Sequence, residues 1–195
     1  DMDVSRVKVT PLEIGGGFGG KIPIYLEPIV ATLSKKSRRP VKAIMERSNV
    51  FQASGPAPGG TITVKMGTDK NGKLIAAETS IKLEAGGFPG AAVGAAVQCI
   101  FAPYDIPNTR IDGYDIVVNK PKSAAYRAPG SPQAAFATET VVNELAELHG
   151  MDRVEFRQVN ASKEGTRRAD GVVFPVIGNE EVLDAAKASD HWNSE

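Results

Sequence analysis

The choice of fold depends on a glycine-rich stretch near the N-terminus, Gly15-Gly16-Gly17-Phe18-Gly19-Gly20-Lys21-Ile22. Five of the six residues from Gly15 to Gly20 are glycine, the residue that loses most conformational freedom on folding. Such a cluster is typical of a backbone that needs unusual dihedral angles or passes close to another group. We call residues 15–21 the glycine loop, and its residues fit three interpretations.

Two of these interpretations involve a nucleotide. The stretch matches the phosphate-binding pattern G-x-x-x-x-G-K-[ST] up to Lys21, but Ile22 lacks the hydroxyl that would hold magnesium. It also matches the dinucleotide pattern G-x-G-x-x-G from Gly15, with a predicted strand before it and Glu46 closing the next predicted strand. A dinucleotide-binding oxidoreductase domain is therefore one alternative. The third interpretation is a surface loop without a ligand, in a non-catalytic interaction module.

Hydrophobic periodicity predicts the remaining elements. The predicted strands are 4–10, 41–45 and 111–118, and a hairpin spans 61–85 around Asn71-Gly72. The predicted helices are 24–36, 133–149 with Ser131 as its N-cap, 152–159 capped by Asp152, and 180–189 capped by Asn179. Loops are predicted at 52–60 and 163–178, and the Gly/Ala-rich stretch 86–96 has no clear period. Because strands and helices do not alternate strictly, we predict an α+β fold of mixed α/β layers. We divide it into a glycine-loop subdomain, residues 1–58, and a subdomain of hairpin plus helices, residues 59–195.

Composition argues against several classes of partner. The 23 basic and 23 acidic residues cancel, so nothing favours a nucleic acid electrostatically. The single cysteine, Cys99, allows no internal disulfide, makes a zinc or iron–sulfur site built from this chain alone unexpected, and is interpreted as a buried small side chain. No apolar run approaches the roughly 18 residues that a transmembrane helix needs. We expect no nucleic-acid or membrane partner and a cytoplasmic location.

A second stretch, Tyr126-Arg127-Ala128-Pro129-Gly130-Ser131-Pro132-Gln133, leads into the helix predicted from residue 133. By local chemistry alone it is a capped helix N-terminus, which favours anions. Together with the glycine loop, which begins 111 positions before Tyr126, it resembles the molybdenum-cofactor subunits of the xanthine dehydrogenase/aldehyde oxidase superfamily. Those subunits carry a GGGFGGK loop and a (Y/F)RG-x-G-x-PQ segment at this spacing. The resemblance extends over residues 4–190 and includes the flanking stretches 39–42, 104–108, 143–146 and 150–152.

The resemblance implies a pterin-bound molybdenum cofactor, either molybdopterin or its cytosine dinucleotide form. Such enzymes hydroxylate a carbon atom with oxygen from water, and their iron–sulfur clusters and FAD are expected on other domains or subunits, which would be partners of this chain. None of its residues would bind the metal directly. The cofactor-binding residues that the resemblance implies are Gly17, Phe18, Gly19, Gly20, Arg127, Ala128 and Gly130.

The resemblance also implies a substrate pocket formed by Phe18, Ile22 and Pro129. Purine-oxidising members carry a glutamate where Ile22 stands and an aromatic residue where Pro129 stands. Members that oxidise carbon monoxide carry a cysteine at the position of Ala128. These differences argue against xanthine and carbon monoxide, and leave an aldehyde or an aromatic or N-heterocyclic small molecule as the substrate.

The family's general base is a glutamate in a glycine-rich motif near the subunit's C-terminus, and nothing after residue 165 matches that motif. Glu139 and Glu144 lie on a predicted helix and are interpreted as packing or surface residues, with His149 at the helix end. We therefore predict no catalytic residue in this chain. We expect a fragment of a longer subunit that is inactive without the rest of that subunit.

Overall fold

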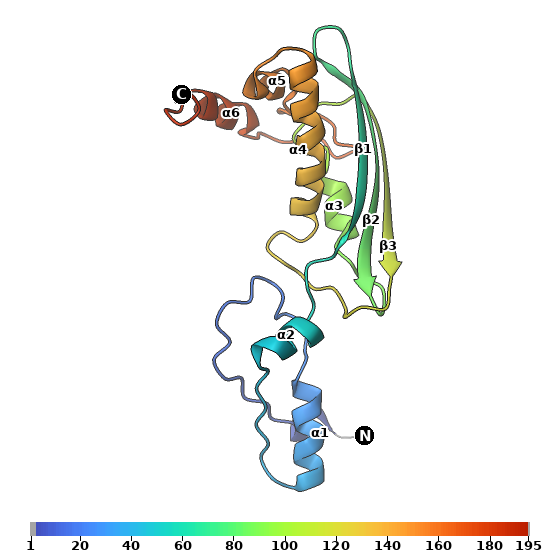
Figure 1. Cartoon of the computed structure of the whole chain (residues 1–195), viewed down its shortest axis with the longest axis vertical. Helices are drawn as coiled ribbons and strands as arrows, with labels where there is room; N and C mark the ends of the chain where they lie inside the picture. The colour runs from blue at the N-terminus through green and yellow to red at the C-terminus, as the bar shows by residue number, and fades with distance from the viewer. Residues whose placement is uncertain (1–2, 195) are drawn as a thin grey trace. The chain divides into compact units, whose positions relative to one another are not determined.

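A computed structural model describes residues 3–194 of the chain. Residues 1, 2 and 195, which the predicted subdomains 1–58 and 59–195 include, lie outside the described part. The elements in chain order are η1 (Val4–Arg6), α1 (Glu27–Ser37), α2 (Arg47–Ala53), β1 (Gly60–Thr68), β2 (Leu74–Gly86), α3 (Val93–Cys99), β3 (Asn108–Val117), α4 (Ser131–Leu148), α5 (Arg153–Asn160) and α6 (Asn179–Lys187) (Figure 1). The predicted mixed fold of helices and strands is confirmed.

The chain divides into two compact units. The first unit contains the described residues up to Pro58, together with Glu84–Ala91 and Ile116–Ala128. The second unit contains Gly59–Leu83, Ala92–Asp115 and the described residues from Pro129 onward. Each unit is therefore discontinuous in sequence. The functional division at residue 58 stays a prediction.

The second unit is built on a three-stranded sheet with the order β1-β2-β3. Strands β1 and β2 form the predicted hairpin, antiparallel from the pair Gly60↔Leu83 to the pair Thr68↔Leu74. The arrowheads of β2 and β3 point the same way in Figure 1, and the chain between them passes through α3. A parallel neighbour requires such a crossover connection.

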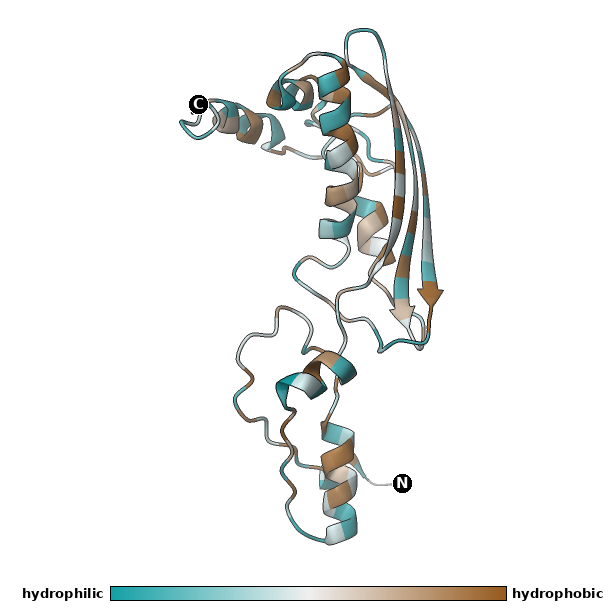
Figure 2. Ribbon diagram, viewed as in Figure 1, coloured by the Kyte–Doolittle hydropathy of each residue, from teal (hydrophilic) through white to brown (hydrophobic). Residues whose placement is uncertain are grey.

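The core lies between the sheet and helices α3 and α4, which cover one of its faces (Figure 1). Buried residues alternate along most of β2, as expected for a strand with one buried face, and Figure 2 shows the corresponding alternation of hydropathy. The buried positions of α4 recur every four residues and carry short side chains: Ala134, Thr138, Val142 and Ala146. Small side chains on this stripe allow the helix to lie close to the sheet, and Phe156 of α5, fully buried, fills the remaining volume.

The first unit has almost no core of its own. Among the described residues, every apolar side chain that is buried belongs to the second unit except Pro58 and Ala85. Helices α1 and α2 contain no buried residue. Large apolar side chains of this unit are instead exposed, such as Ile22 at 78%, Phe51 at 77% and Ile44 at 69%. None of the helices within residues 3–194 is long and apolar enough to cross a bilayer.

The predicted strands 4–10 and 41–45 are wrong. Residues Val4–Arg6 form a short 3-10 helix capped by Asp3, whose carboxylate accepts a hydrogen bond of 2.9 Å from the Ser5 amide. Residues 41–45 have no regular secondary structure, and no strand of the described chain pairs with them. A β-branched alternating pattern suits a sheet without supplying the neighbour that a sheet needs.

Helix α1 begins at Glu27, three residues after the predicted start, because Pro28 occupies its first turn, where the missing N–H costs nothing. Helix α4 is confirmed, but its N-cap is Gly130 and Ser131 is its first residue. Helix α6 likewise has Gly178 as its N-cap, in place of the predicted Asn179. Helix α2 extends into the predicted loop 52–60, and α3 begins within the stretch 86–96, which has no clear period.

The cap of α5 is as predicted, since the Asp152 carboxylate accepts hydrogen bonds from the amides of Val154 and Glu155 at 2.9 and 3.0 Å. The last residue of α5 then joins this helix to the hairpin. The fully buried Asn160 side chain accepts from the Leu74 amide at 2.7 Å and donates to the carbonyl oxygens of Gly72 and Phe156 at 2.9 Å. It thereby satisfies backbone groups where β2 begins.

We expect Asn160→Ala to lower the free energy of unfolding by about 2–3 kcal/mol, because the buried Leu74 amide loses its acceptor. Urea unfolding followed by circular dichroism measures this loss. Asn119→Ala, at an exposed position, is the control and should change the free energy by less than about 0.5 kcal/mol. An equal effect of the two substitutions would contradict the role of Asn160.

Candidate functional site

The glycine loop contacts the segment around Arg127 inside the first unit. The Arg127 amide donates a hydrogen bond of 2.8 Å to the carbonyl oxygen of Phe18. A Cβ atom placed on Gly19 would lie 3.0 Å from both the Cβ and the carbonyl oxygen of Ala125. Two stretches that are more than a hundred residues apart in sequence therefore meet backbone to backbone.

Several residues at this junction have left-handed backbone conformations. Gly19 has φ +99°, while Phe18 and Ala128, which carry side chains, have φ 50° and 58°. Non-glycine residues rarely adopt positive φ, and such positions concentrate at functional sites where the surroundings enforce them. The loop is closed by two turn hydrogen bonds, from the Gly20 amide to Gly17 at 2.8 Å and from the Ile22 amide to Gly19 at 3.3 Å.

This conformation leaves donors available. Within residues 3–194, the amides of Gly17, Phe18 and Gly19 have no hydrogen-bond acceptor, although Gly17 and Gly19 are partly buried. Consecutive amides in a left-handed turn form a concave surface that favours electron-rich groups. The two glycines place no side chain over these donors. The loop can therefore receive a bulky acceptor at short range.

Tyr25 and Gly55 fix the loop from another direction. The Tyr25 hydroxyl donates to the carbonyl oxygen of Gly20 at 3.0 Å and accepts from the Gly55 amide at 2.9 Å. Gly55 packs against the segment that leads to Arg127, since an added Cβ would lie 2.5 Å from the carbonyl oxygen of Lys122. Sequence reasoning missed both residues, because neither belongs to a motif and they lie thirty positions apart.

The structure lacks the elements that both nucleotide interpretations require around the glycine loop. Both need a strand leading into the loop, and residues 3–58 contain none. The Lys21 ammonium group donates a hydrogen bond to the carbonyl oxygen of Ile14, the residue immediately before the loop. Helix α1 begins at Glu27, six residues beyond Lys21, and so does not start at the glycine loop as a nucleotide-binding helix would.

The predicted site residues divide between the two units. The first unit brings Gly17, Phe18, Gly19 and Gly20 to Arg127, and the Phe18 ring lies 6.5 Å from that of Tyr126, tilted by 52°. Phe18 is 66% exposed and Ile22 is 78% exposed. Pro129 and Gly130 belong to the second unit. There Gly130 packs against α3, since an added Cβ would lie 2.9 Å from the Ala96 nitrogen.

The carboxylate of Glu139 has a packing role in the second unit. It accepts from the Tyr104 hydroxyl at 2.7 and 2.8 Å and from Nε of Arg157 at 2.9 Å, which joins α4 to α5. Burial, followed by the Glu139 charge, raises the pKa of Tyr104 well above its ordinary value, so the phenol stays protonated and donates. His149 contacts Thr68 at 2.7 Å at the end of α4. The described residues contain no cluster of His, Cys, Asp and Glu suited to a metal ion.

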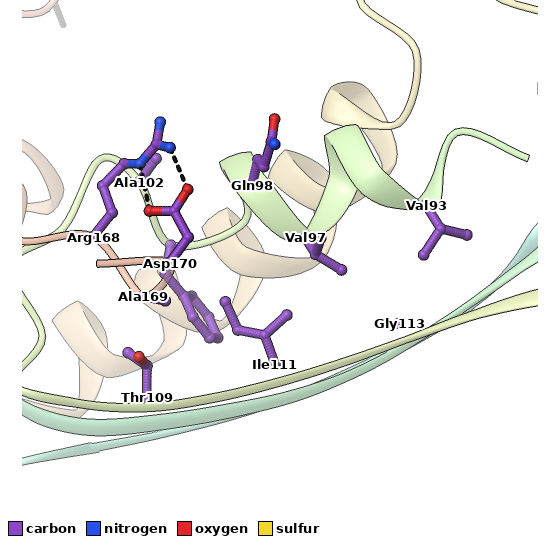
Figure 3. A pocket seen from close by; sticks show the side chains of 11 residues that line it. Val93, Val97, Gln98, Ala102, Thr109, Ile111, Gly113, Arg168, Ala169 and Asp170 are labelled. Carbon is purple, nitrogen blue, oxygen red and sulfur yellow. Dashed lines mark hydrogen bonds and ion pairs between the residues drawn. The ribbon is translucent and has the colours of Figure 1, made fainter. Parts of the chain in front are cut away.

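The second unit also has a hollow of about 400 Å³ between α3, β3 and residues 168–170 (Figure 3). Its walls include Val93, Val97 and Ile111, and the ion pair of Arg168 with Asp170 lies at its side. None of the predicted site residues lines it.

Comparisons with known proteins agree with the two motifs. Residues 1–161 match the model of the molybdopterin cofactor-binding domain. The nicotinate dehydrogenase large molybdopterin subunit of Eubacterium barkeri is 32% identical over 94% of this chain and 44% of its own length. The xanthine dehydrogenase of Blastobotrys adeninivorans is 32% identical over 80% of this chain and 12% of its own length.

Solved structures show the same fold. The aldehyde oxidoreductase from Desulfovibrio gigas superimposes with a TM-score of 0.82 at 28% identity, covering 89% of this chain and 20% of that one. The chain thus spans less than half the length of these relatives.

Gly19→Ala should separate the two segments of the junction, because its Cβ meets Ala125 and its φ of +99° disfavours a side chain. We expect the hydrogen exchange of the Arg127 amide to become roughly tenfold faster. This ratio corresponds to a loss of about 1.4 kcal/mol in the free energy of local opening. Gly17→Ala is the matched control, since its Cβ would make an ordinary contact of 3.5 Å with Lys21. If the Arg127 amide exchanges at the same rate in both variants, the junction does not depend on Gly19.

Proposed function

The chain belongs to the molybdopterin cofactor-binding domain family, and from this premise we propose that its glycine loop holds a molybdenum–pterin cofactor in a molybdenum hydroxylase. The observation that carries the proposal is the junction of the loop with Arg127, in which the amides of Gly17, Phe18 and Gly19 have no acceptor within the described part of the chain. A cofactor with oxo and dithiolene groups presents electron-rich acceptors. Three free amides, two of them on glycine, fit such a group without steric conflict.

In this proposal the chain binds and orients, while the cofactor supplies the redox chemistry when it is bound. The amides of Gly17, Phe18 and Gly19 would donate hydrogen bonds, with Gly20 closing the turn behind them. The backbone of Arg127 and Ala128 would contact the cofactor from the neighbouring segment. Gly130, which caps α4, is assigned to the cofactor from the resemblance.

The exposed side chains next to these amides would shape the substrate pocket. Phe18 and Ile22 offer apolar surface in the first unit, and Pro129 is assigned to the same pocket from the resemblance. Ile22 and Pro129 carry neither the acid nor the aromatic ring found in purine-oxidising members. We propose an aldehyde or an aromatic or N-heterocyclic substrate, in keeping with relatives named for nicotinate and aldehyde oxidation.

The partners in this proposal are the rest of the same subunit and the domains or subunits with iron–sulfur clusters and FAD. The exposed apolar side chains of the first unit support the first of these, because large apolar side chains are stabilised when another surface removes them from water. The relatives are more than twice as long as the chain and therefore include further segments that can cover it. The cofactor can be molybdopterin or its cytosine dinucleotide form.

We expect the protein purified with its natural subunits to contain molybdenum and to oxidise nicotinate or an aromatic aldehyde. In water enriched in ¹⁸O the product should carry the heavy isotope. Xanthine should react with a kcat/KM lower by roughly a hundredfold or more, because the pocket lacks the glutamate partner for the purine.

Residues 1–195 alone serve as the control and should show no turnover, because the family's general base has no counterpart among them. A molybdenum-free native protein would refute the proposal. Tight, saturable binding of a nicotinamide dinucleotide that Gly19→Ala abolishes would instead support the dinucleotide alternative.

A further inference from the structure

Three backbone segments of the first unit form a closed chain of contacts with the Tyr25 side chain. The glycine loop contacts Tyr25 through Gly20, and Tyr25 contacts the loop at residues 54–56 through Gly55. That loop holds the third segment, since the Ala124 amide donates to the carbonyl oxygen of Pro56 at 2.9 Å. The third segment continues to Arg127 and returns to Phe18 of the glycine loop.

The Tyr25 hydroxyl contributes the two side-chain hydrogen bonds of this chain of contacts, whereas the other two hydrogen bonds join backbone groups. Its two partners are both backbone groups, a carbonyl oxygen and an amide. A phenol can accept and donate at once, and its ring has few rotatable bonds to immobilise. Removing only the oxygen would leave Gly20 without a donor and Gly55 without an acceptor, while the half-buried ring could remain in place.

The glycine loop needs such an external support. Its internal hydrogen bonds are confined to the two turns that end at Gly20 and Ile22. The Phe18 conformation at φ 50° is unfavourable for a residue with a side chain, so the surroundings must stabilise it. Arg127 fixes the carbonyl side of Phe18, and Tyr25 fixes the end of the turn at Gly20.

We propose that Tyr25 is a positioning residue for the cofactor: its hydroxyl holds the glycine loop in the conformation that leaves the amides of Gly17, Phe18 and Gly19 free. This inference rests on the proposed function. Tyr25 touches neither cofactor nor substrate in it and acts through Gly20. The loop would sample other conformations without the hydroxyl, and fewer molecules would present the three donors together.

The test is Tyr25→Phe in the full-length protein purified with its natural subunits. We expect molybdenum to be released roughly three- to tenfold faster during dialysis than from the wild-type protein. A change of this size corresponds to the loss of about one ordinary hydrogen bond's contribution to the stability of the loop conformation. The electron paramagnetic resonance spectrum of the molybdenum that remains should also change, because the hydrogen bonds around it are altered.

Two other tyrosines provide matched controls. Tyr104→Phe removes a buried hydroxyl with two hydrogen bonds to Glu139 in the second unit, and Tyr114→Phe removes an exposed hydroxyl on β3. Tyr104→Phe should lower the melting temperature without changing the molybdenum spectrum, and Tyr114→Phe should change neither. Wild-type release and spectrum in Tyr25→Phe would overturn the inference, as would an effect no larger than that of Tyr104→Phe.

Hydrogen exchange in the wild-type protein tests the inference even if the Tyr25→Phe variant does not fold or cannot be purified. The Gly55 amide, which donates to the Tyr25 hydroxyl, should exchange with deuterium more slowly than an exposed amide of the first unit that has no acceptor. Fast exchange at Gly55 would overturn the inference even if the native protein contains molybdenum. A native protein without molybdenum would refute the proposed function separately, whatever the exchange rate of Gly55.

Discussion

The hydrogen bond from the Arg127 amide to the Phe18 carbonyl is the interaction on which the candidate site depends. It joins two segments that are more than a hundred positions apart in sequence, at a point where Gly19 permits contact without a side chain. In this bond the carbonyl oxygen of Phe18 is the acceptor, while the Phe18 amide has no acceptor among the described residues. The carbonyl oxygens of Gly17 to Gly20 are thus occupied by the turns, by Arg127 and by Tyr25, while the amides of Gly17, Phe18 and Gly19 have no acceptor among the described residues.

This use of carbonyl groups gives the site its chemical character. A loop whose amides and carbonyls were both free would bind water or collapse on itself. Here the carbonyls of Gly17, Phe18 and Gly19 each accept a backbone hydrogen bond, while the corresponding amides have no acceptor within residues 3–194. The net effect is a local concentration of backbone donors, while the one charged side chain of the loop, Lys21, donates to the carbonyl oxygen of Ile14. Such a surface suits an electron-rich group that must be held close, and a charged side chain would instead fix a single counter-ion.

The two units differ in what stabilises them. The second unit has an apolar core between its sheet and α4, its buried Asn160 bonds to the backbone where β2 begins, and Glu139 pairs with Arg157 between α4 and α5. The first unit is held mainly by backbone hydrogen bonds and close glycine contacts. Hydrogen bonds of this kind contribute little net stability when water can replace them. The proposed cofactor site is thus carried by the part of the chain that is least stabilised by burial.

Local sequence features predicted the elements whose stability is local. The hairpin followed from Asn71-Gly72 between alternating strands, and α4 and α5 followed from their apolar stripes and from Asp152. The strands predicted at 4–10 and 41–45 were wrong, because a strand exists only if a neighbour pairs with it. Residues 17–20 and Arg127 could be singled out because each belongs to a motif, yet no periodicity could place Tyr25 against Gly55.

These observations together explain why the glycine loop needs contacts beyond its own sequence. Five glycines make many loop conformations accessible, and an unfavourable φ at Phe18 lowers the population of the one described here. Arg127, Tyr25 and Gly55 each exclude some of the alternatives, and none of them belongs to the loop. A ligand that accepts hydrogen bonds from Gly17, Phe18 and Gly19 would exclude still more, and its binding would stabilise the first unit in proportion to its affinity. In the proposed function, order in this unit and occupancy of the site would therefore be thermodynamically coupled: whatever strengthens the contacts of Arg127 or Tyr25 would also strengthen binding, and binding would strengthen those contacts equally.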